Sequence, residues 1–565
     1  MVALETRETN QVDLAEKLDQ SCQIQSSDDT TISKASSKKK KNKKKSQAVE
    51  SLNPFYQESM KQYPVKVNIT RTKGRHAIAS ENLKEGEELL IEKATSFVVR
   101  SEFIDQQCHI CLNDLDAQKI KCSDCNLSFY CSQSCKDKDY LHPSVCYPFT
   151  QLYAIGRATD VDPDLLRLMT ILIARKHTDC TGESAHDKST PFWCVNDLVS
   201  HRDSCSPDFI KVVTDASQRL SMEMSDTIRI PVDDMVTLAC RINSNAHGLG
   251  DNQSRNTDVA LGLFPLAALF FNHSCNPNCM FVGLPDGKLS MRTIRPVSKD
   301  EELVVTYIDL YSDRDERRQE LFETKHFWCK CKRCASPIEK SVDRFLQGVL
   351  CDRCDEDVYV IPPTSMENLV KGQRNLYTST VPFKCASCGD ESSPDAVRQH
   401  LEDANKIYSL GMTAIRQKRD YKRGAEKLEL LTKSESSHGG ELHILNSYRF
   451  NSYIPLMNCK RHSGDMKGAI EVNKFILIML EQYSEIGLLP GNTSEISDFW
   501  QNLGELCDKM ATESRGRSHV LEKKWLKEAR TAFVRALKMR TIVFGKNHPK
   551  TKFVEKFVTT LTSSL

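Results

Sequence analysis

Alternating apolar and polar positions predict β-strands in two stretches of the chain, separated by a long segment with other patterns. In each stretch, short runs rich in Val, Ile, Leu and Phe alternate with polar residues, as expected of strands with one buried face. The predicted strands lie at residues 65–69, 89–91 and 97–99, then around Phe281 and at 291–294 and 303–307.

Apolar residues three and four positions apart predict helices between and after these stretches. Residues 164–176 form one such segment, and the pattern stays helical from about residue 400 to the end. Clear examples are Ala469, Val472, Phe475, Ile476 and Met479, and then Ala529, Ala532, Phe533, Ala536 and Leu537. The second run closes with Gly545 and Pro549, a typical end of a tetratricopeptide-type helix pair. A plain helical bundle is the alternative interpretation.

Length and composition predict a multidomain globular protein. The 565 residues correspond to three or four domains at roughly 150 residues each, and 39% of them are hydrophobic. We find no apolar run of about 18 residues, which argues against a spanning helix and a membrane partner. No charged start followed by an apolar stretch opens the chain, so a secretory signal is not expected.

The formal net charge of +2 conceals an uneven distribution. Seven lysines lie between Lys38 and Lys45, and without them 71 basic residues face 76 acidic ones. Self-repulsion should keep residues 1–62 disordered, as a solvated tail. A nuclear-import signal and a contact with RNA or DNA are the functional alternatives. Specific nucleic-acid binding is disfavoured, because no aromatic residues interleave with the lysines.

The 23 cysteines are the outlying feature of the composition. Without a secretory signal they indicate reduced thiols and metal sites rather than disulfides. Eight ligands fall within 39 residues, enough for two tetrahedral zinc ions. They are Cys108, Cys111, Cys122, Cys125, Cys131, Cys135, His142 and Cys146.

Two further clusters predict two more structural zinc ions. Three cysteines, Cys329, Cys331 and Cys334, need a fourth ligand, for which Cys275 is the candidate. Two CxxC pairs form a site of the zinc-ribbon kind with Cys351, Cys354, Cys385 and Cys388. Four thiolates leave no open position for water activation. The remaining cysteines should be free thiols: Cys22, Cys180, Cys194, Cys205, Cys240, Cys279, Cys459 and Cys507.

A dense polar run, Asn-His-Ser-Cys-Asn-Pro-Asn at 272–278, directly follows apolar residues 261–271. Burying such a run is costly unless its groups are hydrogen-bonded to one another or to a ligand. Taken alone it would be a satisfied polar turn. It is accompanied by Lys-Gly-Arg-His-Ala-Ile at 73–78 upstream and by Glu-Glu-Leu-Val-Val-Thr-Tyr-Ile-Asp at 301–309 downstream.

In this order, followed by Cys-Lys-Cys-Lys-Arg-Cys at 329–334, these motifs resemble the successive elements of a SET domain. The cysteine-rich block resembles a MYND zinc finger, and a MYND finger inserted in a SET domain is the arrangement of the SMYD family of lysine methyltransferases. The resemblance implies an α+β multidomain fold: a β-rich SET fold with an inserted finger, a post-SET zinc site and an all-α, tetratricopeptide-like C-terminal domain.

The domain boundaries follow from this resemblance. The SET N-terminal part would span 63–107, the finger 108–146, a helical insertion 147–250, and the SET core 251–312. The post-SET zinc site would span 313–335, the zinc-ribbon-like insertion 345–392, and the helical domain 395–565. In the finger, Cys108, Cys111, Cys131 and Cys135 would hold one zinc, and Cys122, Cys125, His142 and Cys146 the other.

The resemblance also implies a reaction, the transfer of a methyl group from S-adenosyl-L-methionine to a lysine of a histone or non-histone protein. Tyr307 would be the catalytic residue and would also contact the cofactor; a core-facing strand tyrosine is the alternative. The other implied cofactor contacts are Lys73, Gly74, Arg75, Asn243, Asn272, His273 and Phe327. Family members often carry Tyr where this chain has Lys325 and Phe where it has Asn245, which predicts a less aromatic lysine channel.

The alternative function is a weakly active or inactive SET-fold interaction protein, or a corepressor acting through its MYND finger. The resemblance implies a protein substrate with a target lysine, proline-containing peptides bound by the finger, a monomer, and a cytoplasmic and nuclear location.

Overall fold

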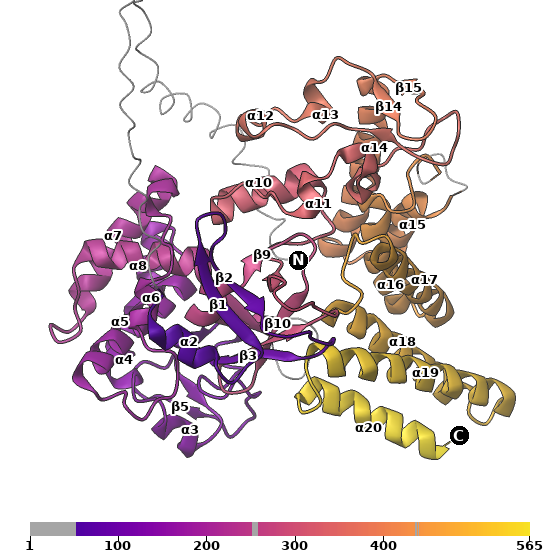
Figure 1. Cartoon of the computed structure of the whole chain (residues 1–565). Helices are drawn as coiled ribbons and strands as arrows, with labels where there is room; N and C mark the ends of the chain where they lie inside the picture. The colour runs from indigo at the N-terminus through magenta and orange to yellow at the C-terminus, as the bar shows by residue number, and fades with distance from the viewer. Residues whose placement is uncertain (1–51, 251–257, 435–437, 439, 565) are drawn as a thin grey trace, which may run out of the picture.

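The computed structural model describes residues 52–250, 258–434, 438 and 440–564. Small sheets occupy the centre, with the helical insertion on one side and the C-terminal helices on the other (Figure 1). Within the described residues, no helix combines the length and the apolar character needed to cross a membrane. The lysine block and Cys22 lie outside the described residues.

The strands pair in small sheets that lie side by side. The first sheet pairs β1 (Val65–Thr70) with β2 (Gly74–Ala79). In the second, β11 (Lys288–Thr293) lies between β10 (Cys279–Leu284) and β3 (Glu88–Lys93). In the third, β8 (Asp258–Leu263) lies between β4 (Ser96–Val99) and β7 (His247–Gly250). All of these pairs are antiparallel. Each predicted strand before residue 300 is present, and β2 is an addition that the alternation alone did not indicate.

The polar run at 272–278 enters a parallel pair, in which β9 (Asn272–His273) lies beside β12 (Val304–Val305). The completely buried amide of Asn278 fixes this pair, since its oxygen accepts from Val304 N–H at 2.8 Å and its nitrogen donates to the Glu302 carbonyl at 2.8 Å. Strand β12 is shorter than the predicted 303–307, because the Tyr307 N–H donates to a side chain, that of His273, instead of continuing the ladder.

Helices pack against the outer side of this core. Helix α5 (Pro163–Thr181) extends the predicted helix at both ends and contacts α4 (His142–Thr159), α8 (Val232–Asn245) and strand β4. Helices α6 (Trp193–Asn196) and α7 (Pro207–Glu223) and the 3-10 turns η1 (Ser101–Phe103) and η2 (Arg202–Ser204) complete this side.

A helix is present N-terminal to Tyr63, inside the range 1–62 that was predicted as a disordered tail. Helix α2 (Pro54–Met60) starts on an Asn53 cap and buries Tyr56 and Met60. The Tyr56 hydroxyl donates to Asp197 at 2.5 Å. The helix is too short for apolar periodicity to reveal it, and its stability comes from these tertiary contacts.

The cysteine-rich segments carry little regular structure. The finger holds β5 (Ile120–Lys121), β6 (Phe129–Tyr130) and α3 (Gln133–Asp137). Helices α9 (Pro265–Phe270) and α10 (Arg314–Lys325) come before the later cysteine clusters. The segment of those clusters contains the short helices α11 (Lys332–Ala335), η3 (Ile338–Lys340), η4 (Val342–Phe345), α12 (Met366–Val370) and α13 (Asn375–Thr378). It also contains a sheet of β13 (Tyr359–Val360), β14 (Phe383–Cys385) and β15 (Glu391–Ser392).

The C-terminal region is helical, as predicted, and each helix packs on the next in chain order, as in a helical repeat. The helices are α14 (Pro394–Arg416), α15 (Tyr421–Thr432), α16 (Ser447–His462), α17 (Met466–Glu485), α18 (Ser494–Ser514), α19 (His519–Val543) and α20 (Pro549–Ser564). This region meets the sheets through Arg292, which donates to the Ile542 carbonyl at 3.1 Å, and through His548, whose ring hydrogen-bonds the Gly283 carbonyl at 3.0 Å.

Candidate functional site: four cysteine clusters and the residues around Tyr307

The sixteen predicted metal ligands come together in four groups of four, with the ligand atoms of each group within 4.8 Å of one another. Sulfur–sulfur distances of 3.5 Å for Cys111–Cys131, 3.6 Å for Cys351–Cys388 and 3.7 Å for Cys122–Cys146 approach the edge of a tetrahedron with zinc–sulfur bonds of about 2.3 Å. The donor sets therefore fit zinc, with the interleaved pairing that the MYND resemblance implies.

His142 is oriented for this role by a neighbour. Its Nε2 lies 3.3 Å from the Cys122 sulfur and 3.7 Å from the Cys125 sulfur, while its Nδ1 lies 3.2 Å from the Ser128 hydroxyl. A ligating histidine usually has its other ring nitrogen held in this way, which fixes the ring and its tautomer. His142 is thus placed as a fourth ligand beside Cys122, Cys125 and Cys146.

The third cluster joins the polar run to the post-SET segment. The Cys275 sulfur lies 3.5 Å from that of Cys334 and 4.0 Å from that of Cys329, across more than fifty residues of sequence. Cys275 follows β9 directly, so an ion here would fix the position of the preceding His273 and Asn272. Because four thiolates complete the coordination of zinc, this cluster would hold structure rather than take part in chemistry.

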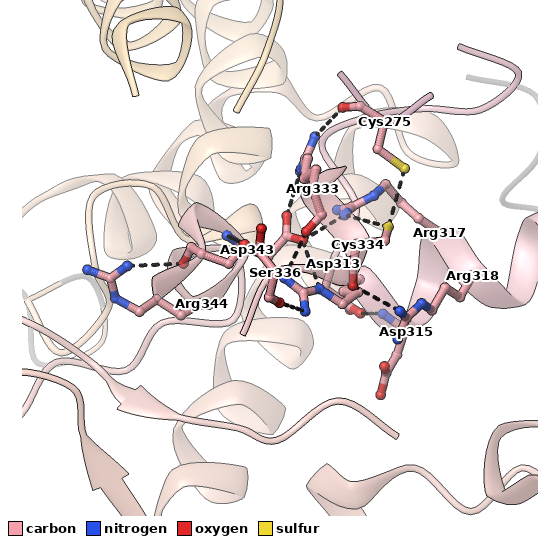
Figure 2. A network of polar contacts seen from close by, with 12 residues as sticks. Cys275, Asp313, Asp315, Arg317, Arg318, Arg333, Cys334, Ser336, Asp343 and Arg344 are labelled. Carbon is pink, nitrogen blue, oxygen red and sulfur yellow. Dashed lines mark hydrogen bonds and ion pairs between the residues drawn. The ribbon is translucent and has the colours of Figure 1, made fainter. Parts of the chain in front are cut away.

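A buried network of arginines surrounds this cluster (Figure 2). The Asp343 carboxylate, with a fully buried side chain, accepts from Arg314 at 3.0 Å, Arg317 at 2.8 Å and Arg333 at 2.8 Å. Burial alone would raise the pKa of Asp343, but the charges of Arg317 and Arg333 lower it to about 2. Arg317 also points a guanidinium nitrogen at the Cys334 sulfur, 3.8 Å away.

The charges of this network fit a zinc ion. Zinc with four thiolates carries a net charge of −2, and three guanidinium groups with one carboxylate carry +2. Buried charges are tolerated only when they are compensated and hydrogen-bonded. The arginines would therefore supply the countercharge for a zinc tetrathiolate. This charge balance supports a zinc site independently of the cysteine spacing.

The predicted cofactor residues upstream and downstream meet at one point. The Asn272 side-chain amide donates to the Arg75 carbonyl at 3.2 Å and to the Glu302 carboxylate at 3.2 Å. Lys73 forms an ion pair with the same carboxylate at 2.7 Å. Glu302 thereby ties the turn before β2 to strand β9, whereas the Arg75 guanidinium is turned away and donates to the Asp197 carbonyl at 2.6 Å.

Gly74 begins β2 beside this point, with a positive φ of 65°. Side chains rarely adopt this conformation, and no heavy atom lies within 4 Å of where a Cβ would stand. The backbone here can thus be approached closely by a ligand.

Tyr307 lies next to His273. Its N–H donates to His273 Nδ1 at 3.0 Å, and its hydroxyl donates to the Phe271 carbonyl at 2.8 Å. Because Nδ1 accepts, Nε2 carries the ring proton and faces the Cys275 sulfur at 3.3 Å. Burial lowers the pKa of His273 to about 4, which keeps the ring neutral, and burial of the hydroxyl raises the pKa of Tyr307 above its ordinary value.

Although its hydroxyl is buried, 36% of the Tyr307 residue is exposed. The Phe327 ring lies 6.0 Å from that of His273, so the predicted residues His273, Tyr307 and Phe327 form one cluster. Lys325 joins them: its Nζ lies 5.9 Å from the centre of the Tyr307 ring and donates to the Ser244 carbonyl at 2.8 Å.

Asn243 is exposed near the end of α8, one residue before Ser244, whose carbonyl accepts from Lys325. The Asn245 amide donates to the Val199 and Arg241 carbonyls, at 2.9 and 2.8 Å. Glu302 has no predicted role, although it lies in the motif at 301–309. Asp343 was not predicted either, since nothing in the sequence around an isolated Asp indicates three arginine partners.

Comparison with known proteins agrees with this arrangement. A family model of the SET domain matches residues 74–308. The chain is 21% identical over 482 residues to the N-lysine methyltransferase SMYD2 of Homo sapiens, covering 84% of this chain and 94% of that protein. It is 25% identical over 382 residues to the human histone-lysine N-methyltransferase SMYD1 (62% and 71%), and 26% identical over 290 residues to the Arabidopsis thaliana histone-lysine N-methyltransferase ASHR1 (49% and 57%).

The fold and the site thus define a SET-domain protein whose domain is interrupted by a finger with two cysteine-rich metal sites. Within that class, the chain is similar to the SMYD methyltransferases, at 21–25% identity.

Proposed function

We propose that the chain is an S-adenosylmethionine-dependent protein-lysine N-methyltransferase. The observation that carries the proposal is the meeting of three distant segments at one place, which we propose as the cleft for the cofactor and the target lysine. The turn at Lys73 and Gly74, the run from Asn272 to His273, and Tyr307 with Phe327 all contribute to it.

The cleft residues divide between holding the cofactor and orienting the amine. S-adenosylmethionine supplies a methyl group on a positively charged sulfur. Asn272 and Lys73, held together by Glu302, would bind its polar amino-acid part, and the Phe327 ring would pack on its adenine. Gly74 leaves room for a close approach along the backbone, and the Arg75 backbone and Asn243 would lie along the bound cofactor.

Tyr307 would orient the target amine. A lysine ammonium has a pKa of about 10.4 and must lose a proton before its nitrogen can attack. Desolvation in an apolar channel lowers that pKa and favours the neutral amine. The Tyr307 hydroxyl donates to the Phe271 carbonyl, so its oxygen lone pairs remain to accept from the amine. The rate then depends on alignment of the nitrogen with the methyl group.

The substrate class is taken from the relatives. The names of the human SMYD1 and Arabidopsis thaliana ASHR1 relatives specify histone lysines, and that of human SMYD2 specifies lysine alone. We therefore propose histone and non-histone proteins as substrates. The finger would bind proline-containing peptides, and the enzyme would act as a monomer in cytoplasm and nucleus.

The test is transfer of label from S-adenosylmethionine to core histones and to a panel of non-histone proteins. Wild type should label protein, and Tyr307→Phe should lose most of that activity. Tyr377→Phe, at a tyrosine that is 53% exposed and far from the cleft in sequence, is the matched control and should act as wild type. Equal labelling by wild type and Tyr307→Phe would remove Tyr307 from the mechanism.

A SET-fold interaction protein acting through its finger is the second candidate. The ammonium of Lys325 beside the Tyr307 ring favours it, because a resident cation competes with a substrate lysine. Calorimetry separates the two functions. Micromolar binding of S-adenosylmethionine together with turnover supports the enzyme, whereas absence of both supports the interaction protein.

A further inference from the structure

Lys325 is the last residue of α10, and its half-buried side chain lies beside the Tyr307 ring. Its Nζ donates to the Ser244 carbonyl at 2.8 Å and lies 5.9 Å from the centre of the Tyr307 ring. A backbone carbonyl and the face of an aromatic ring are the two kinds of group that hold an alkylammonium ion.

The surroundings of this ammonium contain polar atoms that the fold leaves unused. Among the residues that the structure describes, the buried Ser244 hydroxyl and the Nδ1 of His247 have no hydrogen-bond partner. Only 7% of Ser244 is exposed. Buried polar atoms without partners are uncommon and costly, and they require a specific explanation. A site that accepts a polar ligand supplies one.

The electrostatics permit one cation in this place. Burial lowers the pKa of the Lys325 ammonium, an effect that the carboxylate of Glu320 partly offsets. Burial and the charge of Lys325 together lower the pKa of His247 to about 4, so the imidazole is neutral beside it. A second ammonium in the same place would meet the repulsion of the first with little solvent to screen it.

We propose that the Lys325 ammonium occupies the acceptor-amine position of this site, so that a substrate lysine must displace it before methyl transfer. The inference rests on the proposed function, since it names the group that competes for the same position. Lys325 is thus a specificity-determining residue: it excludes acceptors that bind weakly and admits those whose flanking contacts outweigh its own.

A purely structural role for Lys325 makes different predictions. The Ser244 carbonyl lies at the C-terminal end of α8, and a lysine there could serve only as a cap on free carbonyls. A cap affects stability but not competition with a substrate. The two roles are therefore separated by the acceptor KM and by competition, not by melting temperature.

The experiment uses the full chain and four variants: Lys325→Ala, Lys325→Ser, Lys325→Met and, as control at an exposed lysine, Lys340→Ala. The probe is n-butylammonium, which has the shape and charge of a lysine side chain. Lys325→Ala should bind it saturably, by calorimetry or NMR without cofactor, and wild type and Lys340→Ala should not. Lys325→Met fills the same space without charge and should not bind it. Lys325→Ser replaces the alanine variant if that one does not fold.

In the histone assay, Lys325→Ala should lower the acceptor KM about tenfold, equivalent to about 1.4 kcal/mol. In this variant n-butylammonium should inhibit competitively with histone, which it should not do in wild type. Equal KM and equal amine binding in wild type and Lys325→Ala would overturn the inference, as would amine binding by Lys325→Met. If no variant transfers label, the proposed function fails, but the amine-binding comparison still decides the role of Lys325.

Discussion

Replacing Asp343 by Asn removes the negative charge at the centre of the arginine network while keeping the shape of the side chain. Asp343 accepts from three guanidinium groups and has no exposed side-chain surface. The variant keeps one acceptor oxygen and introduces an amide that must point its N–H groups at a guanidinium. The three arginines then carry one positive charge more than the zinc tetrathiolate can compensate.

The expected loss follows from these contacts. Hydrogen bonds to charged groups contribute about 1.5–3 kcal/mol each, but the three share one acceptor and do not add. Removing one partner from a buried ion pair costs about 3–5 kcal/mol. We expect Asp343→Asn to lose this amount of stability. The loss should be local to the post-SET cluster and η4, which Arg333 connects to the Leu488 carbonyl.

The assay follows zinc release with a colorimetric chelator during urea unfolding, in parallel with circular dichroism. Asp343→Asn should release a fraction of the zinc at lower urea than wild type. Glu339→Gln, at an exposed carboxylate four residues away, is the matched control and should match wild type within about 0.5 kcal/mol. Equal zinc release by Asp343→Asn and Glu339→Gln would refute a stabilising role of the network.

A double variant tests whether charge neutrality is the cause. Arg317→Met alone leaves the zinc tetrathiolate with too little positive charge, whereas Arg317→Met combined with Asp343→Asn restores the balance. The pair should therefore be less destabilised than the sum of the single variants by about 1–3 kcal/mol. Strict additivity would mean that the arginines pack around the cluster without compensating its charge.

Three further predictions concern metal, pH and cofactor. Elemental analysis should find four zinc ions per chain, one for each cluster, and two or fewer would contradict the assignment. Burial raises the pKa of Glu92 from 4.5 to about 7, so between these values the folded state holds a proton that the unfolded state has lost. The stability of wild type relative to Glu92→Gln should therefore fall by up to about 3 kcal/mol between about pH 5 and 8. A constant difference between the two proteins in urea unfolding would disprove this. Glu302→Gln frees Lys73 and Asn272 from their shared partner. Since the Lys73–Glu302 ion pair is partly exposed, we expect S-adenosylmethionine affinity, measured by calorimetry, to fall by about 1 kcal/mol or less. A gain in affinity would contradict the role of Glu302 in holding these two residues for the cofactor.

The features predicted correctly from sequence depend on local spacing or on a motif. The CxxC pairs bring two sulfurs to one metal over a single turn, so the paired cysteines could be named in advance. The interleaving of the pairs in the finger came from the family resemblance, and Cys275 from the need for a fourth ligand. Helix α5 was likewise evident from its apolar face, although its caps at Asp162 and Gly182 lie beyond the predicted ends. The motif around Tyr307 was informative because its companions, at 73–78 and 272–278, lie in the expected order.

Features that depend on long-range packing could not be predicted in this way. The contact between Lys325 and Ser244 joins residues 81 positions apart, and neither residue has a neighbour that indicates the other. Arg333 reaches the Leu488 carbonyl across 155 positions, which fixes the C-terminal helices to the post-SET segment. Such contacts arise from the way separate helices pack, and sequence periodicity describes only the face that each helix buries.

The central claim is tested most directly by measuring single-turnover methyl transfer to core histones with a deuterium-labelled methyl group on S-adenosylmethionine and locating the label by mass spectrometry. The account predicts label on lysine side-chain nitrogens, and a rate about 100-fold lower for Tyr307→Phe, because that variant removes the hydroxyl that aligns the amine. Label that appears at the same rate in Tyr307→Phe, or no label from wild type while the cofactor is bound, would contradict it.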